Sequence, residues 1–211
     1  MNRPMLALLA AGSLLCSRAA AQAPQASPAL KDYTAADVHF MSGMIYHHAQ
    51  AILIAGWAKS HGAGPSVQTL CDRIIASQRD EITLLSNWLR ARHEAVPHVD
   101  PQQMYMSGMG GMAMGGGGMD SSHVMPGMLT TQQLAQLDSA RGPDFDALFL
   151  RFMIQHHQGA ITMVNQLFAA SGGEEEPVYK MATGVFADQT TEIERMQRML
   201  AADLFGPTTP K

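Results

Sequence analysis

The chain carries one short motif twice: MIYHH at Met44–His48 and MIQHH at Met153–His157. In the same frame, both copies have an aspartate and a phenylalanine before the motif and an Ala-Ile pair after it. A Gln-x-x-Glu-Ile sequence follows each copy, at Gln78–Ile82 and at Gln189–Ile193. An internal repeat of this kind predicts two copies of one structural unit.

Both copies lie in apolar stripes with the i, i+3/i+4 spacing of a helix. Thr34 is expected to cap a helix that runs to about residue 60, and a Gly/Pro turn leads to a second helix at about 66–92. In the second half, a short helix from Thr130 or Thr131 to about residue 140 ends at Gly142-Pro143. Helices at about 145–170 and 177–204 follow. We predict an all-α four-helix bundle made of two repeated hairpins that share one core.

The remaining segments differ in composition. Residues 1–23 have a basic start, a short apolar run and an A-x-A site, which are typical of a secretory signal peptide. We expect a disordered lead-in at 24–33, hairpin repeat 1 at 34–96 and a flexible Gly/Met-rich linker at 97–128. The short helix plus hairpin repeat 2 occupy 129–205, and 206–211 form a tail. The protein is therefore predicted to be periplasmic or secreted.

Charge and cysteine content exclude several classes. The net charge is −4 over 211 residues. No cluster of Lys and Arg is present, which argues against nucleic acid or an anionic membrane as partner. No segment is long and apolar enough to span a bilayer. Beyond the signal peptide the one cysteine is Cys71, so no intramolecular disulfide can form.

The repeated motif combines soft and borderline metal ligands. On a helix, a methionine that lies three and four residues before two histidines shares a face with them. A thioether combined with imidazole favours Cu(I) over Cu(II), and silver can serve as a surrogate for Cu(I). The candidate metal ligands are Met44, His47, His48, Met153, His156 and His157. We expect the following glutamines and glutamates to hydrogen-bond the far imidazole nitrogens. The auxiliary candidates are Gln78, Glu81, Gln189, Glu192, Asp37 and Asp146.

The predicted linker is also rich in thioethers. These bind Cu(I) or Ag(I) without deprotonation, so the linker is a candidate metal-collecting arm. Compositional drift is the alternative interpretation. The candidates are Met104, Met106, Met109, Met112, Met114, Met119, His123, Met125 and Met128.

Two other interpretations stay open. The histidines could be packed core residues of a structural or interaction domain, as we expect for Met41, Met163, Met181, Met196, Met199 and Cys71. A di-metal oxidase is the enzymatic alternative, although such bundles use several carboxylates in Glu-x-x-His pairs. His39, His61 and His93 have no equivalent ligand in the other half and are expected to be surface or accessory residues.

The paired Met-Ile-x-His-His-x-x-Ala-Ile and the later Gln-x-x-Glu-Ile resemble the domain-of-unknown-function 305 family of exported, ferritin-like helical proteins. The resemblance covers about 34–93 and 129–203 and implies a ferritin-like bundle. Characterised members are associated with copper binding and copper resistance, which implies a similar role here. The first copy departs from the family pattern after the histidines, where Leu53-Ile54-Ala55 replaces the Met-Ala that Met163 retains.

Together these features predict an exported, non-enzymatic protein that binds copper for storage, trafficking or resistance. No catalytic residue is assigned. A periplasmic copper-handling protein is the expected partner, and the sequence leaves a homodimer open.

Overall fold

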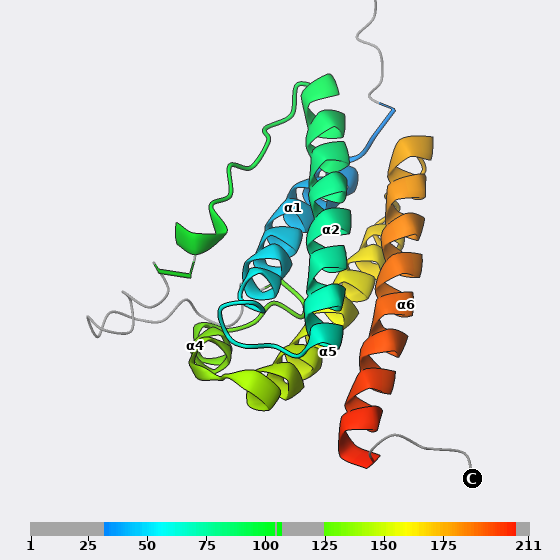
Figure 1. The fold of residues 1–211 in the computed structure, drawn as a ribbon. Coiled ribbons are helices and arrows are strands. Elements are labelled where there is room, and N and C mark those ends of the chain that lie inside the picture. The colour runs from blue at the N-terminus through cyan, green and yellow to red at the C-terminus, as the bar shows by residue number, and fades with distance from the viewer. Residues whose placement is uncertain (1–31, 104, 107–124, 206–211) are drawn as a thin grey trace, which may run out of the picture. The chain divides into compact units, whose positions relative to one another are not determined.

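The computed structural model describes residues 32–103, 105–106 and 125–205. The predicted signal peptide and most of the predicted linker lie outside these residues. The helices are α1 Ala35–Gly56, α2 Pro65–Ala91, α4 Thr131–Ser139, α5 Gly142–Ala169 and α6 Glu176–Phe205 (Figure 1). The described part of the chain contains no strand. The predicted all-α fold is confirmed.

Local sequence signals set the helix starts. Thr34 and Asp37 form a capping box at α1, and Thr130 and Gln133 form one at α4. Such boxes satisfy backbone N–H groups that have no partner within the helix. Pro143 was expected to separate two helices, but it lies in the first turn of α5. Proline is compatible with that position because its missing N–H is not needed there.

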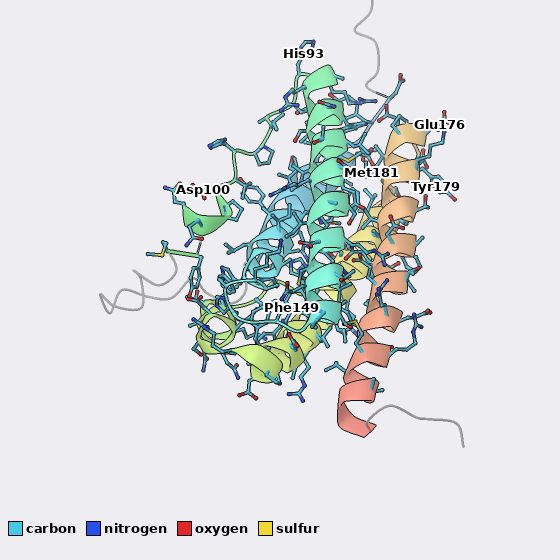
Figure 2. The ribbon with its side chains drawn as sticks, in the orientation of Figure 1. His93, Asp100, Phe149, Glu176, Tyr179 and Met181 are labelled. Atoms are coloured by element: carbon cyan, nitrogen blue, oxygen red, sulfur yellow. The ribbon has the colours of Figure 1, made fainter. Side chains whose placement is uncertain are left out.

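The helices form two hairpins, α1 with α2 and α5 with α6, which pack together mainly through α1 and α5. In Figure 1, α2 and α6 lie on the same side of this central pair. The outer side of α6 faces solvent, as Glu176 and Tyr179 show in Figure 2. The arrangement agrees with the predicted pair of repeated hairpins.

An aspartate near the start of each motif-bearing helix binds the loop of the other hairpin. Asp37 Oδ1 accepts a hydrogen bond from the N–H of Gly173 at 2.6 Å, and Asp146 Oδ2 accepts one from Gly64 at 2.9 Å. Gly173 has a φ of +79°, a conformation that favours glycine. The sequence suggested both aspartates as auxiliary residues of a metal site, and the structure places them at these loop contacts.

The core consists of two apolar clusters and a polar layer. The first cluster includes Phe149 and the second includes Phe40. Each long helix has buried polar residues between the stretches that belong to the two clusters, whereas the buried Asp37 and Ser86 lie outside this layer. The buried polar residues of this layer are His47, His48, Gln50, Gln78, His156, His157, Gln189 and Glu192.

The ends of the predicted linker are held against the bundle. Residues 125–129, which we call the strap, run beside α5, and Gln50 on α1 hydrogen-bonds both the N–H and the C=O of Leu129, at 2.7 and 3.1 Å. At the other end, Tyr105 is buried and donates a hydrogen bond to Asp138 Oδ2 at 2.8 Å. Tyr105 and Met128, near the two ends of the predicted linker, thus both bury apolar surface, and the flexibility predicted for 97–128 as a whole stays a prediction.

Two glycines provide a matched test of strap docking. A Cβ at Gly159 would lie 2.0 Å from Pro126 O, whereas one at Gly184 would meet nothing within 4 Å. We expect Gly159→Ala to lower the free energy of unfolding by about 1–3 kcal/mol through overpacking. Gly184→Ala should raise it by about 0.5–1 kcal/mol because alanine favours helix. Urea unfolding measures both, and equal effects would show that the strap is not docked on α5.

Candidate metal centre

The four motif histidines form a row across the bundle with a glutamate at each end. His47 and His156 meet at the α1–α5 contact with ring centroids 3.8 Å apart. His48 Nε2 lies 2.5 Å from Glu81 Oε2 on α2, and His157 Nε2 lies 2.6 Å from Glu192 Oε2 on α6. The structure therefore brings the predicted histidines and glutamates of both repeats into one layer.

Helix geometry explains this division of roles. Adjacent residues on a helix point about 100° apart, since one turn holds about 3.6 residues. In each His-His pair, one ring therefore faces the other hairpin while its neighbour faces the second helix of its own hairpin. The two rings within a pair are correspondingly separated, by 6.4 Å in α1 and 6.3 Å in α5.

The layer contains many buried polar atoms with no hydrogen-bond partner among the described residues. Burying such an atom unpaired costs about 1–3 kcal/mol. One ring nitrogen of His47 and one of His157 do have a partner, Pro126 O and Glu192 respectively. The contact between His48 and Glu81 is close but lacks hydrogen-bond alignment. The unpaired atoms are Nδ1 of His47, His48 and His157, Nε2 of His48, both ring nitrogens of His156, both side-chain polar atoms of Gln78, Glu81 Oε2 and Gln189 Oε1.

Burial keeps the central imidazoles neutral. It lowers the pKa of His47 from 6.5 to about 3, with a further contribution from the neighbouring His48, and the bond to Pro126 opposes the shift. The pKa of His156 is also well below 6.5, because of burial and then the nearby His47 and His157. Neutral imidazole is the form that binds metal, so these rings need not lose a proton first.

The methionines border this layer. Met44 and Met153 are fully buried, each one helical turn before its His-His pair. Met44 belongs to the apolar cluster on one side of the layer and Met153 to the cluster on the other. Their thioethers therefore approach the histidine row from opposite ends of the bundle.

The linker methionines divide into three groups. Met125 in the strap packs near α1, since a Cβ at Gly43 would lie 3.5 Å from its sulfur. Met128 is buried, and Met106 is exposed. The others lie outside the described residues: Met104, Met109, Met112, Met114, Met119 and His123.

Asp188 is a carboxylate beside this layer that the sequence analysis missed. Burial raises its pKa, and so do the nearby Glu81 and Glu192. Its position four residues before Glu192 was a usable signal because such residues share a helix face. The repeat comparison hid it, since Ser77 occupies the equivalent position of the first copy.

His61 corrects one expectation from the sequence. Predicted as a surface or accessory residue, it is buried, and its Nε2 contacts both the backbone oxygen and Oδ1 of Asp138 at 3.0 and 3.1 Å. It joins the α1–α2 loop to the end of α4. His39 and His93 are exposed, as expected.

The layer is not a closed metal cage built from charged and imidazole ligands. Over the described ranges, no three His, Cys, Asp or Glu side chains are placed to hold one ion. The motif also contains methionine thioethers, which are soft ligands and are not among these four residue types. The available donors of each half are therefore one thioether and two imidazoles.

Fold and layer together define an all-α bundle of two repeated hairpins with a buried Met/His layer. The chain belongs to the family described as Domain of unknown function (DUF305), which matches residues 37–200. No curated protein matches the sequence.

Solved structures support this assignment. A DUF305 fragment from Deinococcus radiodurans is 25% identical with a TM-score of 0.62, covering 80% of this chain and 97% of that one. A Streptomyces coelicolor DUF305 protein, described as secreted, is 24% identical with a TM-score of 0.62, covering 79% and 92%. The bacterioferritin-related thioferritin of Bacteroides fragilis is 12% identical, with a TM-score of 0.56 over 80% and 86% of the two chains, and so shares the fold alone.

CopM is a further structural relative, and its structures include metal-bound forms. The Cu(I)-bound form is 25% identical with a TM-score of 0.57, covering 81% of this chain and 98% of that one. The Cu(II)-bound form is 28% identical with a TM-score of 0.59, covering 78% and 95%. CopM has also been crystallised with silver.

The lowered histidine pKa values predict acid sensitivity of the metal-free protein. Below pH 6.5 the histidines of the unfolded chain become protonated. In the folded protein His47 stays neutral down to about pH 3, and His156 also stays neutral well below pH 6.5. The contribution of the two neutral histidines to stability is therefore fully present above pH 6.5. As the pH falls below 6.5, the free energy of unfolding decreases by up to about 1.4 kcal/mol per pH unit for each histidine. Thermal unfolding at pH 4–7 should show a shallower slope for His47→Gln than for His93→Gln, and equal slopes would contradict the assignment.

Proposed function

We propose that this protein binds Cu(I) in the Met/His layer and serves copper storage, trafficking or resistance outside the cytoplasm. One observation carries the proposal: the buried polar atoms without partners in the described residues are concentrated on the histidines, glutamines and Glu81 of this layer. A bound metal would use several of these lone pairs and so offset their desolvation cost.

The donor chemistry favours a soft, monovalent ion. Thioethers bind Cu(I) and Ag(I) but discriminate against Mg²⁺, Ca²⁺ and Mn²⁺. In one half Met44 with His47 and His48 would hold the ion, and in the other Met153 with His156 and His157. Glu81 and Glu192 would orient the outer rings by accepting from Nε2.

The relatives support copper as the cargo. CopM is described in Cu(I)-, Cu(II)- and silver-bound forms, and it shares this fold over most of both chains. The predicted signal peptide and the secreted Streptomyces relative favour a periplasmic or extracellular location. Among the described residues no helix has the length and apolarity to cross a bilayer.

A ferritin-related oxidase is a second candidate, and Asp188 is the observation that favours it. Asp188 is an exposed carboxylate on α6, and Glu81 and Glu192 lie near enough to contribute to its raised pKa. Oxygen consumption by protein loaded with Fe(II), lost in Asp188→Asn but kept in Met44→Leu, would favour the oxidase over a copper carrier. Non-enzymatic copper binding remains the function that the thioethers support better.

Two pairs of buried methionines allow a matched test. Met44→Leu with Met153→Leu removes the thioethers of the motif, whereas Met41→Leu with Met196→Leu removes two that are equally buried in the apolar clusters. Leucine conserves volume, so both variants should remain folded. In Cu(I) competition against a chromophoric chelator, we expect the first pair to bind roughly tenfold or more weakly, about 1.4 kcal/mol, and the second to match the parent.

The controls separate the bundle from the linker. Replacing the linker methionines at 109, 112, 114 and 119 with leucine should leave the tight bundle site intact. Tight binding that survives loss of Met44 and Met153 but not loss of the linker methionines would move the function to the linker. A parent protein that does not bind Cu(I) would rule out the copper proposal.

A further inference from the structure

A groove of about 420 Å³ lies between α2 and α6, two helices that make few contacts with each other. Figure 1 shows these two helices side by side, running in opposite directions. Three arginine residues line the groove, Arg73 from α2 and Arg195 and Arg198 from α6. Arginine from both walls thus faces one space.

This concentration of positive charge contrasts with the negative net charge of the chain. The net charge is −4, and the sequence contains 14 Lys and Arg in all. Within the described ranges, Arg73 and Arg195 have no ion-pair partner. Arg198 has one long contact, 3.8 Å to Glu194, between two largely exposed side chains. Like charges gathered without counter-charges repel each other, and a bound anion would remove that cost.

The groove contains one carboxylate, that of Glu192, which is already engaged with His157 Nε2 at 2.6 Å. Three arginines against one engaged carboxylate make the lining residues of the groove net positive. Met199 and Ala202 supply an apolar part of the lining. Size and lining resemble those of small-molecule sites, which are commonly 300–1,000 Å³ with a few convergent polar groups.

We propose that this arginine groove binds a small oxyanion of two or more negative charges, a polycarboxylate or a phosphate compound. Planar guanidinium groups pair with both kinds of oxyanion through two parallel hydrogen bonds. A ligand bridging α2 and α6 would also join the two hairpins where they are not in close contact. The proposal concerns the metal-free protein and does not depend on copper binding.

Calorimetric titration of the metal-free mature protein with citrate and with pyrophosphate, at constant ionic strength, tests the proposal. We expect saturable binding of at least one of the two and no saturation with acetate. Stronger binding of citrate would identify a polycarboxylate ligand, and stronger binding of pyrophosphate a phosphate ligand. Equal weak heats from all three anions would overturn the proposal, since they would reflect general screening.

Variants from the two walls locate the site. Arg73→Gln and Arg195→Gln should each weaken binding by roughly tenfold or more, because a charge-assisted bond is lost. Arg151→Gln, at an exposed position on α5 outside the groove, should bind as the parent does. Circular dichroism checks that each variant is folded. Folded Arg73→Gln and Arg195→Gln variants with parental affinity would show that the anion binds elsewhere and overturn the assignment.

Cu(I) titration of the same variants separates the two proposals. Arg73→Gln and Arg195→Gln leave the thioethers and imidazoles of the layer in place, so Cu(I) affinity should be unchanged in the absence of anion. Loss of anion binding with Cu(I) binding intact would support a separate anion site, whereas failure of Cu(I) binding in the parent would leave the anion result standing.

Discussion

The burial of a polar layer in the middle of an apolar bundle is the constraint on which this structure depends. Each partnerless polar atom costs about 1–3 kcal/mol, against a typical net stability of about 5–15 kcal/mol for a whole domain. The two apolar clusters on either side must therefore hold the layer closed. A sequence selected only for stability would place leucine or valine at these positions. Retaining imidazoles there is the strongest physical argument that they serve a ligand.

Holding such a layer requires that the two hairpins keep their register. Asp37 and Asp146 do this reciprocally, since each binds a backbone N–H in the loop of the other hairpin. A sliding motion of one hairpin along the other would break both bonds and separate His47 from His156. The strap adds a third connection, because it contacts α1 through Gln50 and α5 through Gly159. The two aspartate–loop contacts and the strap together thus fix the positions of the central imidazoles.

The repeat made most of this architecture predictable from the sequence. It identified both hairpins, the all-α fold and the pairing of Glu81 and Glu192 with histidines, because helical spacing determines which residues share a face. It did not predict contacts between distant segments. His61 on Asp138, Tyr105 in the core and the strap on α5 all depend on tertiary packing that no local pattern encodes. The repeat did not predict Asp188 because it reveals only residues that are present in both copies.

The strap also breaks the symmetry that the sequence suggests. It contributes the oxygen of Pro126 to His47, while neither ring nitrogen of His156 has a partner among the described residues. The neighbouring residue differs too, because Tyr46 is exposed whereas Gln155 bonds Gln133. Each repeat nevertheless keeps three ring nitrogens without a partner among the described residues: Nδ1 of His47 and both nitrogens of His48 in the first, and both nitrogens of His156 and Nδ1 of His157 in the second. Two similar motifs on one frame therefore present their unpaired nitrogens differently: the strap engages the inner histidine of the first repeat, and Glu192 engages the outer histidine of the second.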